Sequence, residues 1–115
     1  MATRTLSRTE WQLYCDRFSK GLKAEQAQVD ILGLAIGHQK IAAQWVPLLG
    51  IVYDPKSDLV EIALQGLDHI IARPQEISVI EGSEGLESIE IVGADGLRQI
   101  VTLKRPAELA PPSHG

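Results

Sequence analysis

The residues of this 115-residue chain that could carry out chemistry are not spaced as a catalytic set. The three histidines are His38 in a predicted turn, His69 at the start of a predicted strand, and His114 near the end of the sequence. None has a partner at metal-ligand spacing or in the arrangement of a catalytic triad. Asp68 precedes His69, but neighbouring residues of a strand face opposite sides of a sheet. We therefore expect no catalytic histidine.

Other reactive groups are also better explained by structure than by chemistry. Cys15, the single cysteine, lies on the apolar stripe of a predicted helix, so we expect a buried thiol rather than a nucleophile. Asp54, Asp58 and Glu61 could form an oxygen cage for a cation, but their loop lacks the ligand spacing and central glycine of an EF-hand. Residues 93–96 carry two glycines inside a hairpin, where no phosphate loop forms. The sequence predicts no catalytic residue, no metal site and no cofactor.

Charge and hydropathy narrow the possible partners and surroundings. The net charge is −4, but residues 1–23 carry five basic and two acidic side chains, whereas the remainder is strongly acidic. An acidic body repels phosphate backbones, so nucleic acid is not an expected partner. No apolar run approaches the ~20 residues of a membrane span, and no secretory signal opens the sequence. With a single cysteine, these features favour a cytoplasmic protein.

The element nearest the start of the sequence is a short amphipathic helix, predicted over residues 8–20. Ser7 and Glu10 fit a capping box at its beginning. Helical spacing relates its apolar residues, which are Trp11, Tyr14, Cys15, Phe18 and Leu22. Because so short a helix is marginal alone, its apolar stripe must pack on the sheet or on another chain.

Alternating apolar and polar residues predict strands over most of the chain beyond this helix. In the clearest hairpin, burial of one face selects the register that sets Ile89 opposite Val101 and Glu90 opposite Ile100. Gly96 then supplies the positive φ of the bulge after a type I turn. The turn chemistry and the parity of the strands therefore agree.

A second hairpin is predicted around a loop at residues 55–58. Its parity sets three apolar pairs opposite each other: Leu49 with Leu64, Ile51 with Ile62, and Tyr53 with Val60. Pro47 interrupts the long strand 41–53 and marks an edge, a bulge or a bend, because proline cannot donate to a ladder. A further strand, 69–80, is broken at residues 73–74.

Together these elements predict a mainly β (α+β) protein. An N-terminal α-helix is followed by a small, bent antiparallel sheet or barrel of five to six strands. Closure into a barrel would remove the sheet edges, and SH3-like and Sm-like barrels have this order of elements. Residues 1–6 are predicted to be an N-terminal arm, 7–105 a single helix-plus-barrel domain, and 106–115 a disordered Pro-rich tail.

The stretch 45–52 is apolar on both faces of its strand, so both faces need burial. One face fits the barrel core, and the other fits either the N-terminal helix or a second subunit. The residues predicted to lie at or near an interface are Trp11, Trp45, Leu48, Leu49 and Val52.

The sequence resembles an uncharacterised family of small bacterial proteins, domain-of-unknown-function family 5335. The resemblance covers residues 6–105 and leaves the tail out. It implies no catalytic residue, because the family has no assigned activity. The matching features are Glu10-Trp11 with Phe18, residues 29–33, Pro47-Leu48 with Gly50-Ile51, Gly66 with His69 and Pro74, and Ile89 to Ile91 before residues 94–96.

These observations favour a non-enzymatic cytoplasmic protein that acts through protein contacts, including self-association as a homodimer or small oligomer. This interpretation depends on the apolar strand around Trp45 and on the lack of a convergent polar site. One alternative is an Sm-like RNA-binding ring subunit, which the order of elements favours and the charge opposes. Another is a small-molecule-binding or enzymatic domain with a pocket at the barrel mouth, which would depend on His69 and Glu61.

Overall fold

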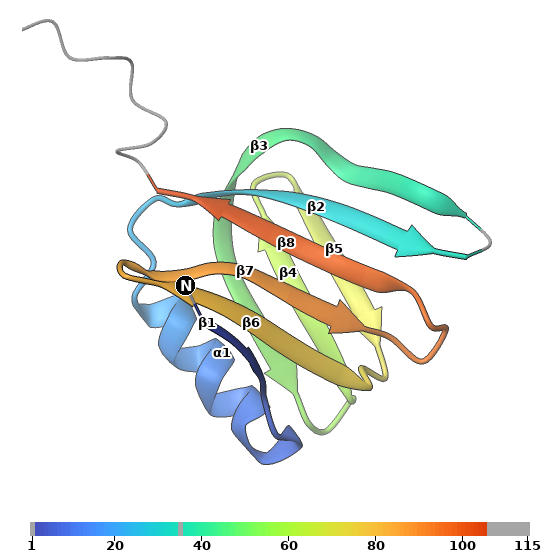
Figure 1. Cartoon of the computed structure of the whole chain (residues 1–115). Helices are drawn as coiled ribbons and strands as arrows, with labels where there is room; N and C mark the ends of the chain where they lie inside the picture. The colour runs from blue at the N-terminus through green and yellow to red at the C-terminus, as the bar shows by residue number, and fades with distance from the viewer. Residues whose placement is uncertain (1, 35, 106–115) are drawn as a thin grey trace, which may run out of the picture.

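The computed structural model describes residues 2–34 and 36–105. The predicted tail, 106–115, lies outside these residues. The described part contains one α-helix, a preceding 3-10 turn and eight strands (Figure 1). Their bounds are β1 (Ala2–Thr5), η1 (Arg8–Glu10), α1 (Trp11–Lys20), β2 (Gln26–Gly33), β3 (Gly37–Asp54), β4 (Leu59–Leu64), β5 (Leu67–Ala72), β6 (Glu76–Gly82), β7 (Gly85–Val92) and β8 (Arg98–Lys104). No helix of these residues is long and apolar enough to cross a membrane.

The strands form one antiparallel sheet in the order β1-β6-β7-β8-β2-β3-β4-β5. Because β1 and β5 end this order without pairing to each other, the sheet is open. The mainly β class with an N-terminal helix is confirmed, whereas the closed SH3-like or Sm-like barrel and the count of five to six strands are wrong. Neither the Sm-like ring nor the barrel-mouth pocket therefore has the fold on which it was predicted.

Two local features account for the larger number of strands. The predicted arm supplies β1, whose residues Ala2 to Thr5 pair with Glu81 to Ser78 of β6. The predicted strand 69–80 divides at Arg73, which has a φ of 48°. Its two parts, β5 and β6, then lie far apart in the strand order. The division sends the chain from one end of the sheet to the other.

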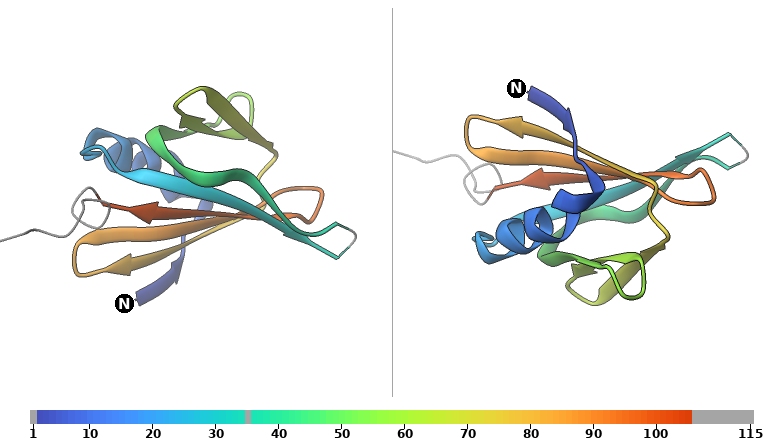
Figure 2. Two further views of the ribbon diagram at one scale, coloured as in Figure 1. Left: turned by 90° about the horizontal axis from the view of Figure 1, so that it is seen from above. Right: turned by 90° about the horizontal axis from the view of Figure 1, so that it is seen from below.

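The long strand β3 joins the two parts of the sheet. Its first half pairs with β2 as far as Pro47, which lies opposite Gln26, and its second half pairs with β4 from Leu48. This is the bend that the proline predicts. Beyond it, β4 and β5 fold away from the layer of β6, β7, β8 and β2 (Figure 2).

The helix α1 lies against the open side of this bent sheet (Figures 1 and 2). The ring of Trp11 meets the ring of Tyr53 edge-on, with centroids 5.2 Å apart. The indole N–H of Trp11 donates to the carbonyl of Leu6 at 3.4 Å. Trp11 is 2% exposed and belongs to the same core cluster as the inward side chains of the strands. The helix therefore takes the place that further strands would fill in a closed barrel.

The predicted strand registers are mostly confirmed. Ile89 faces Val101, Glu90 faces Ile100, and Gly96 has a φ of 81°. In the second hairpin Ile51 faces Ile62 and Tyr53 faces Val60, as predicted.

The one error in this hairpin is at its far end. Leu48, not Leu49, lies opposite Leu64, because a register shift between Leu48 and Gly50 inserts one residue into β3. Leu48 is consequently buried, whereas the side chain of Leu49 is 63% exposed. The bulge thus decides which leucine belongs to the core and which to the surface.

Candidate functional site

The described histidines form hydrogen bonds without assembling a reactive cluster. His38 Nε2 lies 2.9 Å from Asp30 Oδ1, which also accepts from Lys40 Nζ at 2.8 Å. Although burial raises it, these hydrogen bonds bring the pKa of Asp30 below its ordinary value. The His69 ring is hydrogen-bonded to the side-chain oxygen of the buried Gln99, and so connects β5 with β8. His114 lies outside the described residues. Among the described residues, no three His, Cys, Asp or Glu side chains group as metal ligands would.

The other candidate reactive groups also serve the fold. Cys15 is buried as predicted, and desolvation raises the pKa of its thiol to about 11. Asp54 accepts hydrogen bonds from the Lys56 N–H and the Ser57 hydroxyl, which closes the turn between β3 and β4. Asp58 accepts from the hydroxyl of Tyr53 at 2.8 Å. Asp54 and Asp58 therefore both take part in the hydrogen bonds of this turn.

The five residues predicted to lie at an interface divide into three groups by their exposure. Trp11 and Leu48 are buried in the core of the chain. Trp45 is half-buried on β3, with Lys104 Nζ 4.7 Å from its ring centroid. Leu49 and Val52 have exposed side chains. Only part of the predicted set therefore remains available for contacts.

Leu49 and Val52 belong to an apolar surface that also includes Ile70. Ile70 was not predicted from the sequence to be a surface contact residue. Val52 of β3 lies opposite Glu61 of β4, which lies opposite Ile70 of β5. Directly opposed residues point to the same face, so these three side chains form one row on the outer face of the sheet. Val52 is 42% exposed and Ile70 48%. We call Leu49, Val52 and Ile70 the outer patch.

No pattern in the sequence marks Ile70 as an outward residue. The sequence from Asp68 to Ile71 reads as polar, polar, apolar, apolar and does not alternate. It therefore reads as part of one long strand, in which the outward position of Ile70 cannot be recognised. An edge strand with one buried face and one exposed apolar residue gives such a mixed pattern.

The edges of the sheet differ in how they are protected. Where β2 no longer runs beside β3, the Ser19 hydroxyl of α1 donates to the carbonyl of Ile51 at 2.8 Å and accepts from its N–H at 2.9 Å. The edge strand β1 is short and carries Arg4, which is paired with Glu10 and Glu81. Charged side chains and short length are ordinary protections against edge pairing.

The strand β5 lies at the other end of the sheet and lacks these protections. It pairs with β4 alone among the described strands. Its six residues include no lysine, arginine or proline, and Asp68 is its one acidic residue. Leu67 and Ile70 on this strand are both exposed. An edge of this kind is a template for pairing with another chain.

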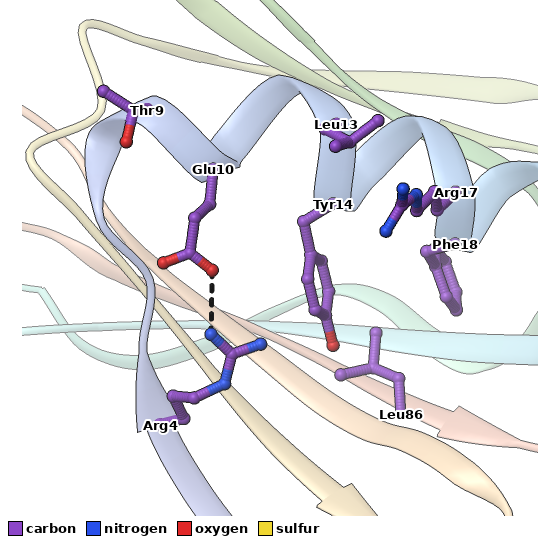
Figure 3. Close-up of a pocket in the computed structure, with 8 residues that line it drawn as sticks. All are labelled: Arg4, Thr9, Glu10, Leu13, Tyr14, Arg17, Phe18 and Leu86. Atoms are coloured by element: carbon purple, nitrogen blue, oxygen red, sulfur yellow. Dashed lines mark hydrogen bonds and ion pairs between the residues drawn. The ribbon is translucent and has the colours of Figure 1, made fainter.

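A groove of about 550 Å³ lies between α1 and the strands β1 and β7 (Figure 3). Leu13, Tyr14, Phe18 and Leu86 give it apolar walls, and Arg4, Thr9, Glu10 and Arg17 complete its lining. Arg4 donates to Glu10 at 2.8 Å, and Tyr14 donates to Glu81 at 2.8 Å.

The ion pair in this groove changes the acidity of one of its carboxyl groups. The hydrogen bond from Arg4, with others from Ser7, lowers the pKa of Glu10 to about 2. A carboxylate of such low basicity is a weak general base near neutral pH. Within the groove Arg4 and Glu10 bind each other, and Tyr14 binds Glu81 beside it.

Comparison with known proteins places this architecture among proteins of unknown activity. The model of a family described as "Family of unknown function (DUF5335)" matches residues 2–112. The match extends beyond the 6–105 of the expected resemblance. An "Uncharacterized protein" of Aquifex aeolicus (strain VF5) is 38% identical over 105 residues, which are 90% of this chain and 94% of that protein. No solved structure matches the chain.

Proposed function

The chain belongs to the DUF5335 family, and because that family brings no assigned activity, we propose a function from the protein's own surface. The protein is a non-catalytic protein-interaction module that self-associates as a homodimer or small oligomer. The observation that carries this proposal is the juxtaposition of the outer patch with the unprotected edge of β5. Both features lie on the same part of the sheet.

The chemistry of the outer patch supports contact with another protein surface. Val52 and Ile70 lie in one row, and Leu49 projects from the bulge of the same strand as Val52. Clustered apolar side chains bordered by polar groups are typical of protein contact sites. Glu61 lies between Val52 and Ile70, and Asp68 lies on β5, so polar groups accompany the apolar side chains. Covering the patch would remove apolar surface from water.

The roles of the chemistry-bearing residues support a module without catalysis. Cys15 is buried with a raised pKa, and His69 is hydrogen-bonded to Gln99. His38 shares Asp30 with Lys40 in a cluster near the tip of the β2–β3 hairpin. Each of these side chains has a structural partner in a different part of the fold, so none of them converges with another on a reacting centre.

Absolute mass from light scattering on a size-exclusion column tests this proposal. We expect the wild-type chain to exceed its monomer mass of 12.6 kDa, and Ile70→Lys to return it to that mass. Leu13→Lys is the matched control, because Leu13 is exposed to a similar extent but lies on α1. A wild-type mass of 12.6 kDa at every accessible concentration would overturn the proposal. An excess of absorbance at 260 nm on the peak would instead indicate a nucleic-acid partner.

A further inference from the structure

We propose that two copies join through the edges of β5, in an antiparallel pairing centred on Ile70. The two eight-stranded sheets would then continue as one. This inference rests on the proposed function and specifies how the two copies meet. It is drawn from the edge of β5, the parity of its side chains and the placement of its single charge.

The first step concerns the backbone of β5. Within the described residues β5 has one strand neighbour, β4, and no backbone hydrogen bond joins it to any other strand. Within the described residues, no backbone group binds the N–H and C=O groups of Asp68 and Ile70 that point away from β4, whereas the carbonyl of Ala72 lies near Gly93. An antiparallel strand related by a two-fold axis presents matching donors and acceptors, so the edge is complementary to itself. The β5 edge of a second copy of this chain can therefore pair with the β5 edge of the first.

The second step excludes the other edges. Ser19 already binds both backbone groups of Ile51 on the second half of β3. The edge of β1 is four residues long, and the ion pairs of Arg4 with Glu10 and Glu81 lie across that part of the sheet. The edge of β5 is longer, and no ion pair within the described residues involves it. Pairing between copies is thus directed to β5.

The third step fixes the register. Opposed residues of paired strands point to the same face, so outward residues of one copy must face outward residues of the other. Pairing centred on Ile70 sets Ile70 against Ile70 of the second copy and Asp68 against Ala72. Pairing centred on His69 would set Asp68 against Ile70 instead. Both registers keep the buried face of β5 on the inner side, where Ile71 lies.

Charge decides between these two registers. Centred on Ile70, the two Asp68 carboxylates are four residues apart along the strands, roughly 13 Å. Centred on His69, they are two residues apart, roughly 7 Å. The second distance is within the screening length of about 8 Å at physiological ionic strength, whereas the first exceeds it. The Ile70 register therefore avoids repulsion and buries an apolar pair at its centre.

The outer face of the joined sheet would have an apolar centre and a polar border. The row across it would read Val52, Glu61, Ile70 and then the same residues of the second copy in reverse order. Interfaces with a buried apolar centre and a polar rim are the common arrangement. In this arrangement the two Ile70 side chains pack against each other, and one Glu61 flanks each of them.

Cysteine cross-linking tests the register directly. In the full chain, Ile70→Cys places two thiols at the axis, where opposed Cβ atoms lie about 4.5–5.5 Å apart. We expect mild oxidation or a short bismaleimide to convert it to a species of twice the 12.6 kDa chain mass. Asp68→Cys alone should stay monomeric on a denaturing gel, and a mixture of Asp68→Cys with Ala72→Cys should cross-link between the two variants. Val52→Cys is the exposed control that should not link. Cys15 is buried and does not interfere.

The outcomes separate this inference from the proposed function. Cross-linking of His69→Cys with itself, or of Asp68→Cys with Ile70→Cys, in preference to the expected pairs would overturn the register. A dimeric mass in solution without any cross-link on β5 would overturn edge pairing and leave self-association standing. A monomeric wild-type mass would overturn both. Because Ile70, Asp68 and Ala72 are all exposed, these variants do not disturb the core.

Discussion

Burial decides what the thiol of Cys15 can do. It is 1% exposed, and desolvation raises its pKa to about 11. At pH 8 about one thiol in a thousand would be ionised, and that fraction is shielded by the core. We expect iodoacetamide to label the native protein at a rate set by unfolding, and the denatured protein rapidly. Fast labelling of the folded chain, without loss of its circular dichroism, would show that Cys15 is accessible.

The carboxylate of Glu10 gives the protein a pH dependence at the start of its helix. Hydrogen bonds from Arg4 and Ser7 lower its pKa from 4.5 to about 2. A lowered folded-state pKa contributes stability that is present above pH 4.5 and is lost as the pH falls toward 2.

We therefore expect Glu10→Gln to destabilise the protein above about pH 5 and to approach wild-type stability near pH 2. Urea unfolding at several pH values measures this difference. Glu76→Gln is the control, because Glu76 is exposed on β6 and makes no hydrogen bond through its side chain to the described residues. A difference between Glu10→Gln and wild type that stayed constant down to pH 2 would contradict the assignment.

At the scale of elements, Ser19 holds α1 against the edge of β3. Its hydroxyl binds both the N–H and the carbonyl of Ile51. Ser19→Ala leaves these backbone groups without partners at a part-buried site, and we expect a loss of about 1–3 kcal/mol in the free energy of unfolding. Urea denaturation measures it, with Ser83→Ala in the exposed β6–β7 loop as control. Equal stability of the two variants would mean that water replaces the hydroxyl.

The registers of the hairpins could be predicted because each strand has one buried face and its side chains alternate with a period of two. Few registers then bury all the apolar side chains. The pairs Ile51 with Ile62 and Ile89 with Val101 follow from parity and turn chemistry alone. Parity fails where the chain inserts a residue, so the bulge at Leu48 was not predictable from alternation. The strand β1 was missed for a related reason: all its side chains are exposed, so no apolar alternation marks it.

The outer patch was predictable only in part. The apolar residues on both faces of the strand around Trp45 indicate that β3 has more apolar side chains than one buried face can hold. Two of them, Leu49 and Val52, are exposed. This pattern could not tell which leucine the bulge would turn outward. Ile70 and the free edge of β5 depend on the strand order, which is a property of the whole sheet. No spacing within one segment contains that information.

At the scale of the whole molecule, the sheet stays open and the helix α1 covers its open side. Local patterns indicated strands and one helix, and barrel closure was inferred because it removes edges. In the structure, a helix rather than further strands covers the open side of the sheet. The apolar stripe of α1 packs into the core, and Trp11 contacts Tyr53 of β3. A closed barrel and an open sheet covered by a helix bury the same kinds of residue. Composition and periodicity therefore cannot distinguish these two folds.

The two tryptophans provide a matched test of this role for the helix. Trp11 is buried between Leu6 and Tyr53, whereas Trp45 is half-buried beneath Lys104. We expect Trp11→Ala to lower the free energy of unfolding by about 3–5 kcal/mol, a large share of the roughly 5–15 kcal/mol typical of a domain. Trp45→Ala should cost clearly less, because its ring is already partly in water.

If α1 joins the two parts of the sheet, the loss in Trp11→Ala should reach both of them. Amide exchange should then accelerate together in β4 and in β6, although neither strand contains the substitution. Exchange that rose in α1 and β3 alone would show that the strands hold together without the helix. Equal unfolding free energies for Trp11→Ala and Trp45→Ala would remove the basis for treating Trp11 as the residue that closes the fold.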